Sequence, residues 1–306
     1  MFEFFIIVSV FFILLSSFFN DLSKNTFIVI GLLFYSYLVA FKGGSGSDTI
    51  YYYTIFEQNL SHAETAFHEP GFGLLKDLVK YFNGDYNVIN YIQSLLVFLS
   101  LFLLSRNQGV FIVSIYISLC GLTIDFSTLR QSLSFHLFVI VFFVIESRPI
   151  AAFLSSFFHY SSLFSFINKF YLLSIKRLFY LISFVVIFYF VFLNRYLDEG
   201  LQFVFRSGFS WLVLFAVYSF AFYLVGYRYR QLVFISMLLY FPIGYRVISY
   251  LLVVDKPIVI PRSFSKKLML LAFFMLITWL KVYSFSEQSI NNDKERSVIL
   301  HYEDKN

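Results

Sequence analysis

The sequence contains a single cysteine, Cys120, so an internal disulfide is excluded. Cys120 lies in an apolar run, where we expect it to be a buried small hydrophobic residue. Charged residues are also scarce: they make up 13% of the 306 residues, whereas soluble domains contain about a quarter. This deficit places the chain in the membrane class.

Motifs that bind metals or nucleotides, or that carry a nucleophile, are absent too. The chain has no HExxH or CxxC frame, no DxD motif and no GxSxG elbow. We therefore expect no metal, no cofactor and no nucleotide-sugar substrate. His62 and His68 lie near Glu64 and Glu69, but this loop spacing is not that of a metal site. Gly43 to Gly46 lacks the Lys-Ser/Thr ending of a P-loop, which leaves an anion-binding nest of backbone amides as the alternative.

Hydrophobic residues make up 59% of the chain and occur in long runs. Since a helix needs about 20 apolar residues to cross a bilayer, and about 17 at the short end, these runs predict an all-α, polytopic integral membrane protein with about ten transmembrane helices. The first run lacks the basic flank of a cleaved signal, so it is counted as a helix. The predicted spans are 2–19, 25–41, 86–105, 109–124, 126–145, 150–174, 178–193, 209–225, 231–254 and 268–285.

The basic residues predict the orientation of these spans, because Lys and Arg favour cytoplasmic loops. The net charge of +5 is spread over short loops, so no nucleic-acid partner is expected. Most clustered basic residues fall on one side if segment 150–174 re-enters the membrane and 231–262 crosses twice. The N-terminus, the long loop 42–85 and Asp198-Glu199 then face outward. Residues 1–285 form a single membrane domain, and 286–306 form a polar tail. The basic groups placed in the cytoplasm are Lys24, Arg106, Arg148, Lys176-Arg177, Arg228-Arg230 and Lys266-Lys267.

The loop 42–85 is the longest polar interval, and long connections of this kind usually carry function. It contains Asp48, the aromatic run Tyr51 to Tyr53, and Glu69. From Pro70 to Phe82 apolar residues recur at helical spacing, which predicts an amphipathic helix on the outer membrane surface that ends near Asn83-Gly84. Glu69 precedes this helix, so a capping role is the alternative to a catalytic one.

Polar side chains inside the predicted spans form a second group of candidates. Arginine within a transmembrane helix costs about 2.5 to 3.5 kcal/mol at the bilayer centre and normally faces a cavity or a partner. Arg130, Gln131 and Ser134 fall on about one helical face and predict a polar stripe; a snorkelling Arg130 is the alternative. His136 lies off this stripe, and we expect it to be structural.

His159 and Arg246 complete the candidates. His159 lies in Phe158-His159-Tyr160-Ser161, in the middle of an apolar segment, where a helix break is expected and a hydrogen-bonded structural histidine is the alternative. Arg246 follows Gly244-Tyr245 in a later apolar region and is also predicted on the outer side. Two buried guanidinium groups on one side favour an anion, and their geometry matches phosphate oxygens.

Taken in order, these features resemble the EpsG-like branch of the Wzy-type bacterial polysaccharide polymerases. The family pattern corresponds here to a basic residue and a glycine-rich turn, an aspartate and a tyrosine, Glu-Pro-x-Phe, an intramembrane arginine, Phe-His-x-Ser, and a late arginine before a proline. Lys42 replaces the usual arginine and Thr49 replaces a tyrosine. The matching positions are Lys42, Gly43 to Gly46, Asp48, Tyr52, Glu69 to Phe72, Arg130, Phe158 to Ser161, and Arg246 with Pro261.

The resemblance implies a multi-pass enzyme of the bacterial inner membrane that joins oligosaccharide repeat units carried on a polyprenyl diphosphate such as undecaprenyl diphosphate. The product would be O-antigen, capsule or exopolysaccharide, made at the outer face of the membrane. The implied partners are the lipid-linked donor and acceptor and the bilayer, together with a flippase and a chain-length regulator. A flippase or transporter of the same lipids and an O-antigen ligase-like transferase are the alternatives, although the internal repeats typical of transporters are not evident.

Roles follow from this resemblance and from the chemistry of the residues. Cations must neutralise the leaving diphosphate, and a carboxylate or imidazole must take the proton of the acceptor hydroxyl. Three candidates for the proton acceptor stay open. The predicted site comprises Glu69, Asp48 and His159 as catalytic residues, Arg130, Arg246 and Lys42 for the diphosphate, and Tyr52 and Gln131 for the sugar.

Overall fold

The structure of the protein is a computed structural model, which describes residues 2–42, 49–58, 70–163, 165–166, 220, 223, 244–254, 263–280 and 282. Every regular element in these ranges is a helix, as the apolar runs predict. The chain divides into two compact units, Met1–Ser162 with Arg262–Asn306, and Leu163–Pro261. In the second unit the longest described element is α14, Gly244–Val254.

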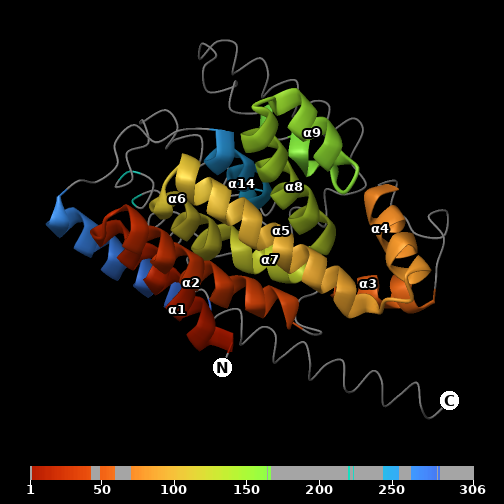
Figure 1. Cartoon of the computed structure of the whole chain (residues 1–306), viewed down its shortest axis with the longest axis horizontal. Coiled ribbons are helices and arrows are strands. Elements are labelled where there is room, and N and C mark those ends of the chain that lie inside the picture. The colour runs from red at the N-terminus through yellow and green to blue at the C-terminus, as the bar shows by residue number, and fades with distance from the viewer. Residues whose placement is uncertain are drawn as a thin grey trace, which may run out of the picture. The chain divides into compact units, whose positions relative to one another are not determined.

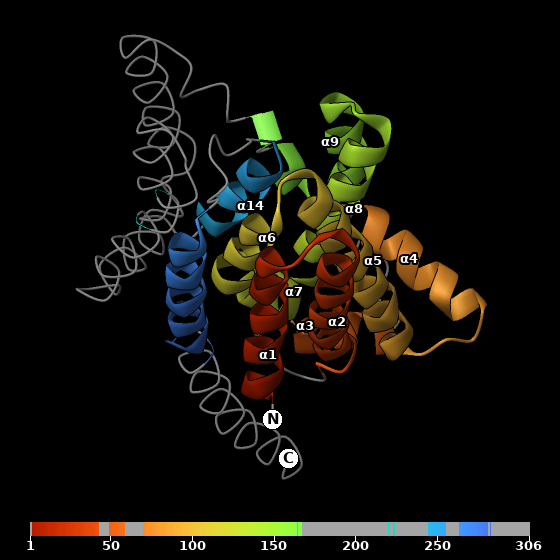
Figure 2. The same cartoon turned by 60° about the vertical axis from the view of Figure 1, so that its left-hand side comes forward.

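The N-terminal helices form a hairpin. Helix α1 spans Phe2–Leu15 and is followed by the short 3-10 helix η1, Ser16–Phe18, and by α2, Asp21–Ala40. A further helix, residues 264–280, lies beside α1 (Figures 1 and 2). Its Lys267 Nζ donates to the carbonyl of Ser17, and the rings of Phe264 and Phe18 are 5.3 Å apart. Lys267 therefore lies at the same end of the hairpin as Lys24.

The centre of the first unit is built from α5 and α8. Helix α5 spans Tyr86–Asn107 and packs against α2 and α8, while α8 spans Leu129–Ile145. In the sequence, α5 and α8 are separated by a continuous helical rod that consists of α6 (Val110–Ile115), the π-helical turn η2 (Tyr116–Gly121) and α7 (Leu122–Ser127). The side chains of this rod are almost all buried. The rod ends at Thr128. Asp125 therefore lies inside a helix, whereas the predicted spans 109–124 and 126–145 placed it between two helices.

Two helices occupy the interval that was predicted as an outer loop, and both lie at the N-terminal end of α5 (Figure 1). Helix α4, Pro70–Tyr81, confirms the predicted helix, and the chain leaves it through Asn83, whose φ is 56°. Its buried face includes Lys76 as well as Phe72 and Val79, so the expected separation into an apolar and a polar face is incomplete. Helix α3, Thr49–Glu57, was not predicted, and the aromatic run at 51–53 is therefore helical.

The segment after α8 confirms the expected break. Helix α9 spans only Arg148–Ser156, and a turn at 157–159 separates it from a short 3-10 helix at 160–163. The rest of the predicted span 150–174 lies outside the described residues, apart from 165–166. The same holds for 178–193, for most of 209–225, for the first half of 231–254 and for the tail 286–306.

Among the described residues two helical stretches are long and apolar enough to cross a membrane, Leu22–Ala40 and Tyr86–Asn107. Three shorter apolar helices accompany them: Phe4–Phe18, Val110–Phe126 and Leu129–Ile145. These five elements coincide with the first five predicted spans. The described ranges do not test the total of ten spans.

Candidate functional site

Arg130 is buried at the start of α8 and is held by a tyrosine. Its side chain is 7% exposed, its Nε donates to the hydroxyl of Tyr52 at 3.1 Å, and its guanidinium carbon lies 5.8 Å from the centre of the Tyr52 ring. A snorkelling arginine would instead expose its guanidinium at the membrane surface. The alternative considered from the sequence is therefore wrong, and Arg130 belongs to the protein interior.

Helices α3, α4, α5 and α8 together hold this pair in a buried aromatic and aliphatic cluster. Tyr52 is 3% exposed and packs against Phe72 of α4 with ring centres 5.2 Å apart. Leu129 and Leu133 of α8 and Tyr86 of α5 belong to the same cluster. Tyr52 was predicted as a sugar-stacking residue of a loop; it lies in the cluster with its hydroxyl bonded by Arg130. Its neighbour Tyr53 is half exposed.

His159 lies in the turn after α9, close to the polar stripe of α8. Ser134 Oγ donates to the carbonyl of His159 at 3.0 Å, so residues predicted on two separate spans are in contact. The backbone N–H of Ser161 donates to His159 Nδ1 at 3.0 Å. A nitrogen that accepts this bond carries no proton, so the neutral ring has its proton on Nε2.

The Glu-Pro-x-Phe and Phe-His-x-Ser segments also meet. Gly71 N donates to the carbonyl of Phe157 at 2.7 Å, which ties the first turn of α4 to the turn that carries His159. A Cβ on Gly71 would lie only 2.7 Å from that carbonyl oxygen, so glycine permits the close approach. Three segments that are distant in sequence therefore converge around Arg130: α3, the start of α4 and the 157–161 turn.

Gln131 is buried but turned away from this cluster. Helical geometry places it about 160° to 200° around α8 from Leu129 and Leu133, which face the cluster. Its side chain is 1% exposed, and within the described part of the chain neither Oε1 nor Nε2 has a hydrogen-bond partner. Buried amides are normally paired, so this one needs an explanation such as a ligand.

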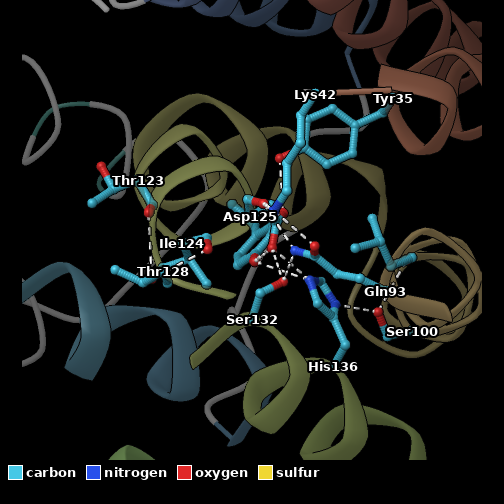
Figure 3. Close-up of polar contacts among 12 residues, drawn as sticks. Tyr35, Lys42, Gln93, Ser100, Thr123, Ile124, Asp125, Thr128, Ser132 and His136 are labelled. Atoms are coloured by element: carbon cyan, nitrogen blue, oxygen red, sulfur yellow. Dashed lines mark hydrogen bonds and ion pairs between the residues drawn. The ribbon is translucent and has the colours of Figure 1, made fainter. Parts of the chain in front are cut away.

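A second polar centre, formed around Asp125, was not predicted. The side chain of Asp125 is fully buried, and four side-chain donors point at its carboxylate. Figure 3 labels Tyr35, Ser132 and His136 among them. An ionised carboxylate only accepts hydrogen bonds, so four donors favour the charged form. The donors are the hydroxyls of Tyr35 at 2.8 Å, Tyr116 at 3.0 Å and Ser132 at 2.8 Å, and His136 Nε2 at 2.7 Å.

Lys42 belongs to this Asp125 network. Its Nζ donates to Gln93 Oε1 and to the main-chain carbonyl of Asp125, both at 2.8 Å, and Gln93 Nε2 donates to the same carbonyl. Burial lowers the pKa of Lys42 from 10.5 to about 7, while the nearby charge of Asp125 raises it. Gln93 also donates to Ser132 at 2.8 Å, so the network reaches α8 two residues beyond Arg130.

The remaining predicted residues fall into two groups. Asp48 and Glu69 lie outside the described residues. Arg246 lies in α14, in the second unit, and the structure describes its backbone but not its side chain. His136, expected to be structural, is fully buried in the Asp125 network, with its Nδ1 2.5 Å from Ser100 Oγ. Cys120 is buried, as expected.

One signal in the sequence pointed to the Asp125 network. Asp125 is the only acidic residue between Asp85 and Glu146, and a carboxylate inside an apolar helix needs partners. Because Asp125 was predicted to lie in a gap between two spans, the cost of burying its carboxylate was not considered. Its partners Tyr35 and Tyr116 could not be singled out, because the chain contains 23 tyrosines.

Apolar helices that enclose a buried arginine and a fully hydrogen-bonded carboxylate define a helical membrane protein with an internal polar site. The model of one protein family, described as the EpsG family, matches residues 25–290. This match covers most of the chain, so the protein belongs to the EpsG family, which indicates a polysaccharide polymerase-like role. No curated protein matches the sequence, and no solved structure matches it.

Proposed function

We propose that the protein is a polysaccharide polymerase of the bacterial inner membrane that elongates oligosaccharide repeat units linked to polyprenyl diphosphate. The reaction would take place at the outer membrane face, without a metal ion or a nucleotide. The observation that carries the proposal is the buried Arg130–Tyr52 pair beside His159, in a member of the EpsG family. A guanidinium stays charged at physiological pH, and its planar fork matches the oxygens of a diphosphate.

The proposed reaction is a glycosyl transfer. The bond between the anomeric carbon of the donor sugar and the diphosphate breaks, and polyprenyl diphosphate leaves with the bonding electrons. An acceptor hydroxyl forms the new glycosidic bond and releases its proton to a base. Arg130 stabilises the negative charge that develops on the diphosphate, which lowers the barrier to departure. Lys42 and Arg246 are proposed as further cations for the same group.

The tautomer of His159 bears on the choice of base. Because Nδ1 accepts the N–H of Ser161, the neutral ring presents an N–H at Nε2 and no free lone pair. This arrangement suits donation to the departing diphosphate better than removal of a proton. We therefore propose that Asp48 or Glu69 is the base that takes the proton of the acceptor hydroxyl. His159 would donate a hydrogen bond to the departing diphosphate.

The two residues proposed for the sugar take different roles. The Tyr52 hydroxyl is bonded by Arg130 and its ring is buried, so its proposed role is to position the guanidinium. Gln131 keeps its proposed role in sugar binding, because both ends of its buried amide lack a partner among the described residues.

The test is elongation by the purified protein. Protein in liposomes is incubated with a lipid-diphosphate repeat unit and EDTA, without nucleotide, and the products are separated by chain length. We expect a ladder from the wild type, its loss in Arg130→Gln and a reduced ladder in Arg130→Lys, which keeps the charge but not the planar fork. Arg106→Gln, at an exposed arginine near the end of α5, is the control.

Three outcomes would overturn the proposal. Normal ladders from Arg130→Gln would remove Arg130 from the site. A single transfer to an unrelated acceptor, without elongation, would indicate a ligase. Movement of the lipid across the bilayer without any new glycosidic bond would indicate a transporter.

A further inference from the structure

Two buried polar groups on α5 have no partner in the part of the chain that the structure describes. The hydroxyl of Tyr86 and Oδ1 of Asn90 are without hydrogen bonds there, although the two residues are only 5% and 2% exposed. Leaving such a group unpaired costs about 1 to 3 kcal/mol, so native proteins rarely do so without a reason. An unoccupied binding position is one such reason.

The two residues lie on one face of α5, between the two polar centres already described. They are four positions apart, which places them one above the other on the helix. Tyr86 packs against Phe56 and Tyr53 of α3, with ring centres 5.9 and 5.6 Å away, and it shares a buried cluster with Tyr52.

Asn90 continues this row toward the Asp125 network. Gln93, three positions further on, bonds both Lys42 and Ser132. This row on α5 therefore connects the Arg130–Tyr52 pair to Lys42. Gln93 is hydrogen-bonded, whereas the Tyr86 hydroxyl and Asn90 Oδ1 have no hydrogen-bond partner among the described residues.

The chemistry of the two groups selects the ligand. Oδ1 of Asn90 is an acceptor, so it needs a donor, and an ionised diphosphate offers none. The hydroxyl of Tyr86 both donates and accepts. Sugar hydroxyls match both requirements, because each donates one hydrogen bond and accepts others.

We propose that Tyr86 and Asn90 bind hydroxyl groups of a sugar of the lipid-linked repeat unit, next to the Arg130–Tyr52 pair. The inference rests on the proposed function, since it adds a sugar position to that site. Arg130 would hold the diphosphate, while the α5 row would distinguish the first sugars attached to it.

If the two groups are unpaired in the free protein, removing them should not lower its thermal stability. Groups that are unpaired in the free protein can be replaced by apolar groups of the same shape with little loss, or even with a gain. We therefore expect Tyr86→Phe and Asn90→Leu to melt at or above the wild-type temperature. Tyr116→Phe removes a hydroxyl that does have a partner, Asp125, and should melt lower.

Binding is measured with two probes: a polyprenyl diphosphate that carries the repeat unit, and the same polyprenyl diphosphate without sugar. We expect Tyr86→Phe to weaken the first by roughly 3- to 10-fold, as for a lost neutral hydrogen bond, and to leave the second unchanged. Tyr91→Phe, on the same helix with a half-exposed ring, should change neither.

Equal affinity of Tyr86→Phe and the wild type for the sugar-bearing lipid would overturn the inference. So would a drop of several degrees in the melting temperature of Tyr86→Phe, since it would show that the hydroxyl has a structural partner. If the wild type makes no ladder but the sugar-dependent difference in binding holds, the proposed polymerisation fails and the sugar site stands. If the ladder forms and the difference is absent, the inference alone fails.

Discussion

Replacing Asp125 with asparagine tests whether its network holds the first unit together. The substitution keeps the shape but removes the charge and turns one acceptor oxygen into a donor. Tyr35, Tyr116, Ser132 and His136 all donate to this carboxylate, so at least one buried donor then faces another donor. Hydrogen bonds to a charged group contribute about 1.5 to 3 kcal/mol each.

The expected loss is about 3 to 5 kcal/mol, which corresponds to roughly two such hydrogen bonds. For a protein of this size the melting temperature should fall by roughly 10 °C. The assay is thermal unfolding of the purified protein in mild detergent. Asp77→Asn is the control, because the side chain of Asp77 is 65% exposed and its carboxylate stays in contact with solvent even though it lies 3.5 Å from the buried Lys76.

A melting temperature of Asp125→Asn within about 1 °C of wild type would refute the reasoning. A double-mutant cycle with His136→Gln adds a second criterion. Because the two residues are in contact, their effects should deviate from additivity by about 0.5 to 3 kcal/mol. Additive effects would mean that the contact at 2.7 Å does not contribute to stability.

Three further predictions concern neighbouring contacts. Gly121→Ala should lower stability by about 1 to 3 kcal/mol in the same assay, because a new Cβ would overlap the Tyr35 hydroxyl; no change would contradict that packing. Gly71→Ala should slow elongation on the order of tenfold, because the new Cβ pushes α4 away from the Phe157 carbonyl. A ladder that grows at the wild-type rate would make this contact dispensable. Burial lowers the pKa of Lys42 to about 7, so between pH 7 and 10.5 the unfolded state binds more protons than the folded state. The free energy of unfolding should therefore rise with pH in this window, and Lys42→Met should flatten the rise. Parallel curves of stability against pH for the two proteins would contradict this.

The sequence predicted the helices well where hydrophobic runs decide the structure. The first five spans and the helix from Pro70 are present within a few residues, because burial and length leave few alternatives. Helix α3 was missed because its apolar positions Tyr52, Ile55 and Phe56 are embedded in a polar interval, and they form a helix only by packing on α5 and α8.

Within the site, contacts between distant segments were harder to predict. The stripe of Arg130, Gln131 and Ser134 was visible from helical spacing. The partners of Arg130 and Ser134, which are Tyr52 and His159, lie on other elements. Lys42 was predicted beside the diphosphate from its charge and from its position in the family pattern. Its bonds to Gln93 and to a main-chain carbonyl depend on how three helices cross.

The π-helical turn η2 fixes the number of residues between Tyr116 and Asp125. A π-turn accommodates one residue more than an α-turn, so a single deletion within Tyr116–Gly121 would let the rod close up as regular α-helix. Everything beyond that deletion would keep roughly its orientation, whereas a deletion between Leu122 and Ile124, in the α-helical part of the rod, would rotate the residues beyond it by about 100° and carry the carboxylate away from its donors. The turn is therefore the one place in the rod where a residue can be lost while Tyr116 and Asp125 still face each other.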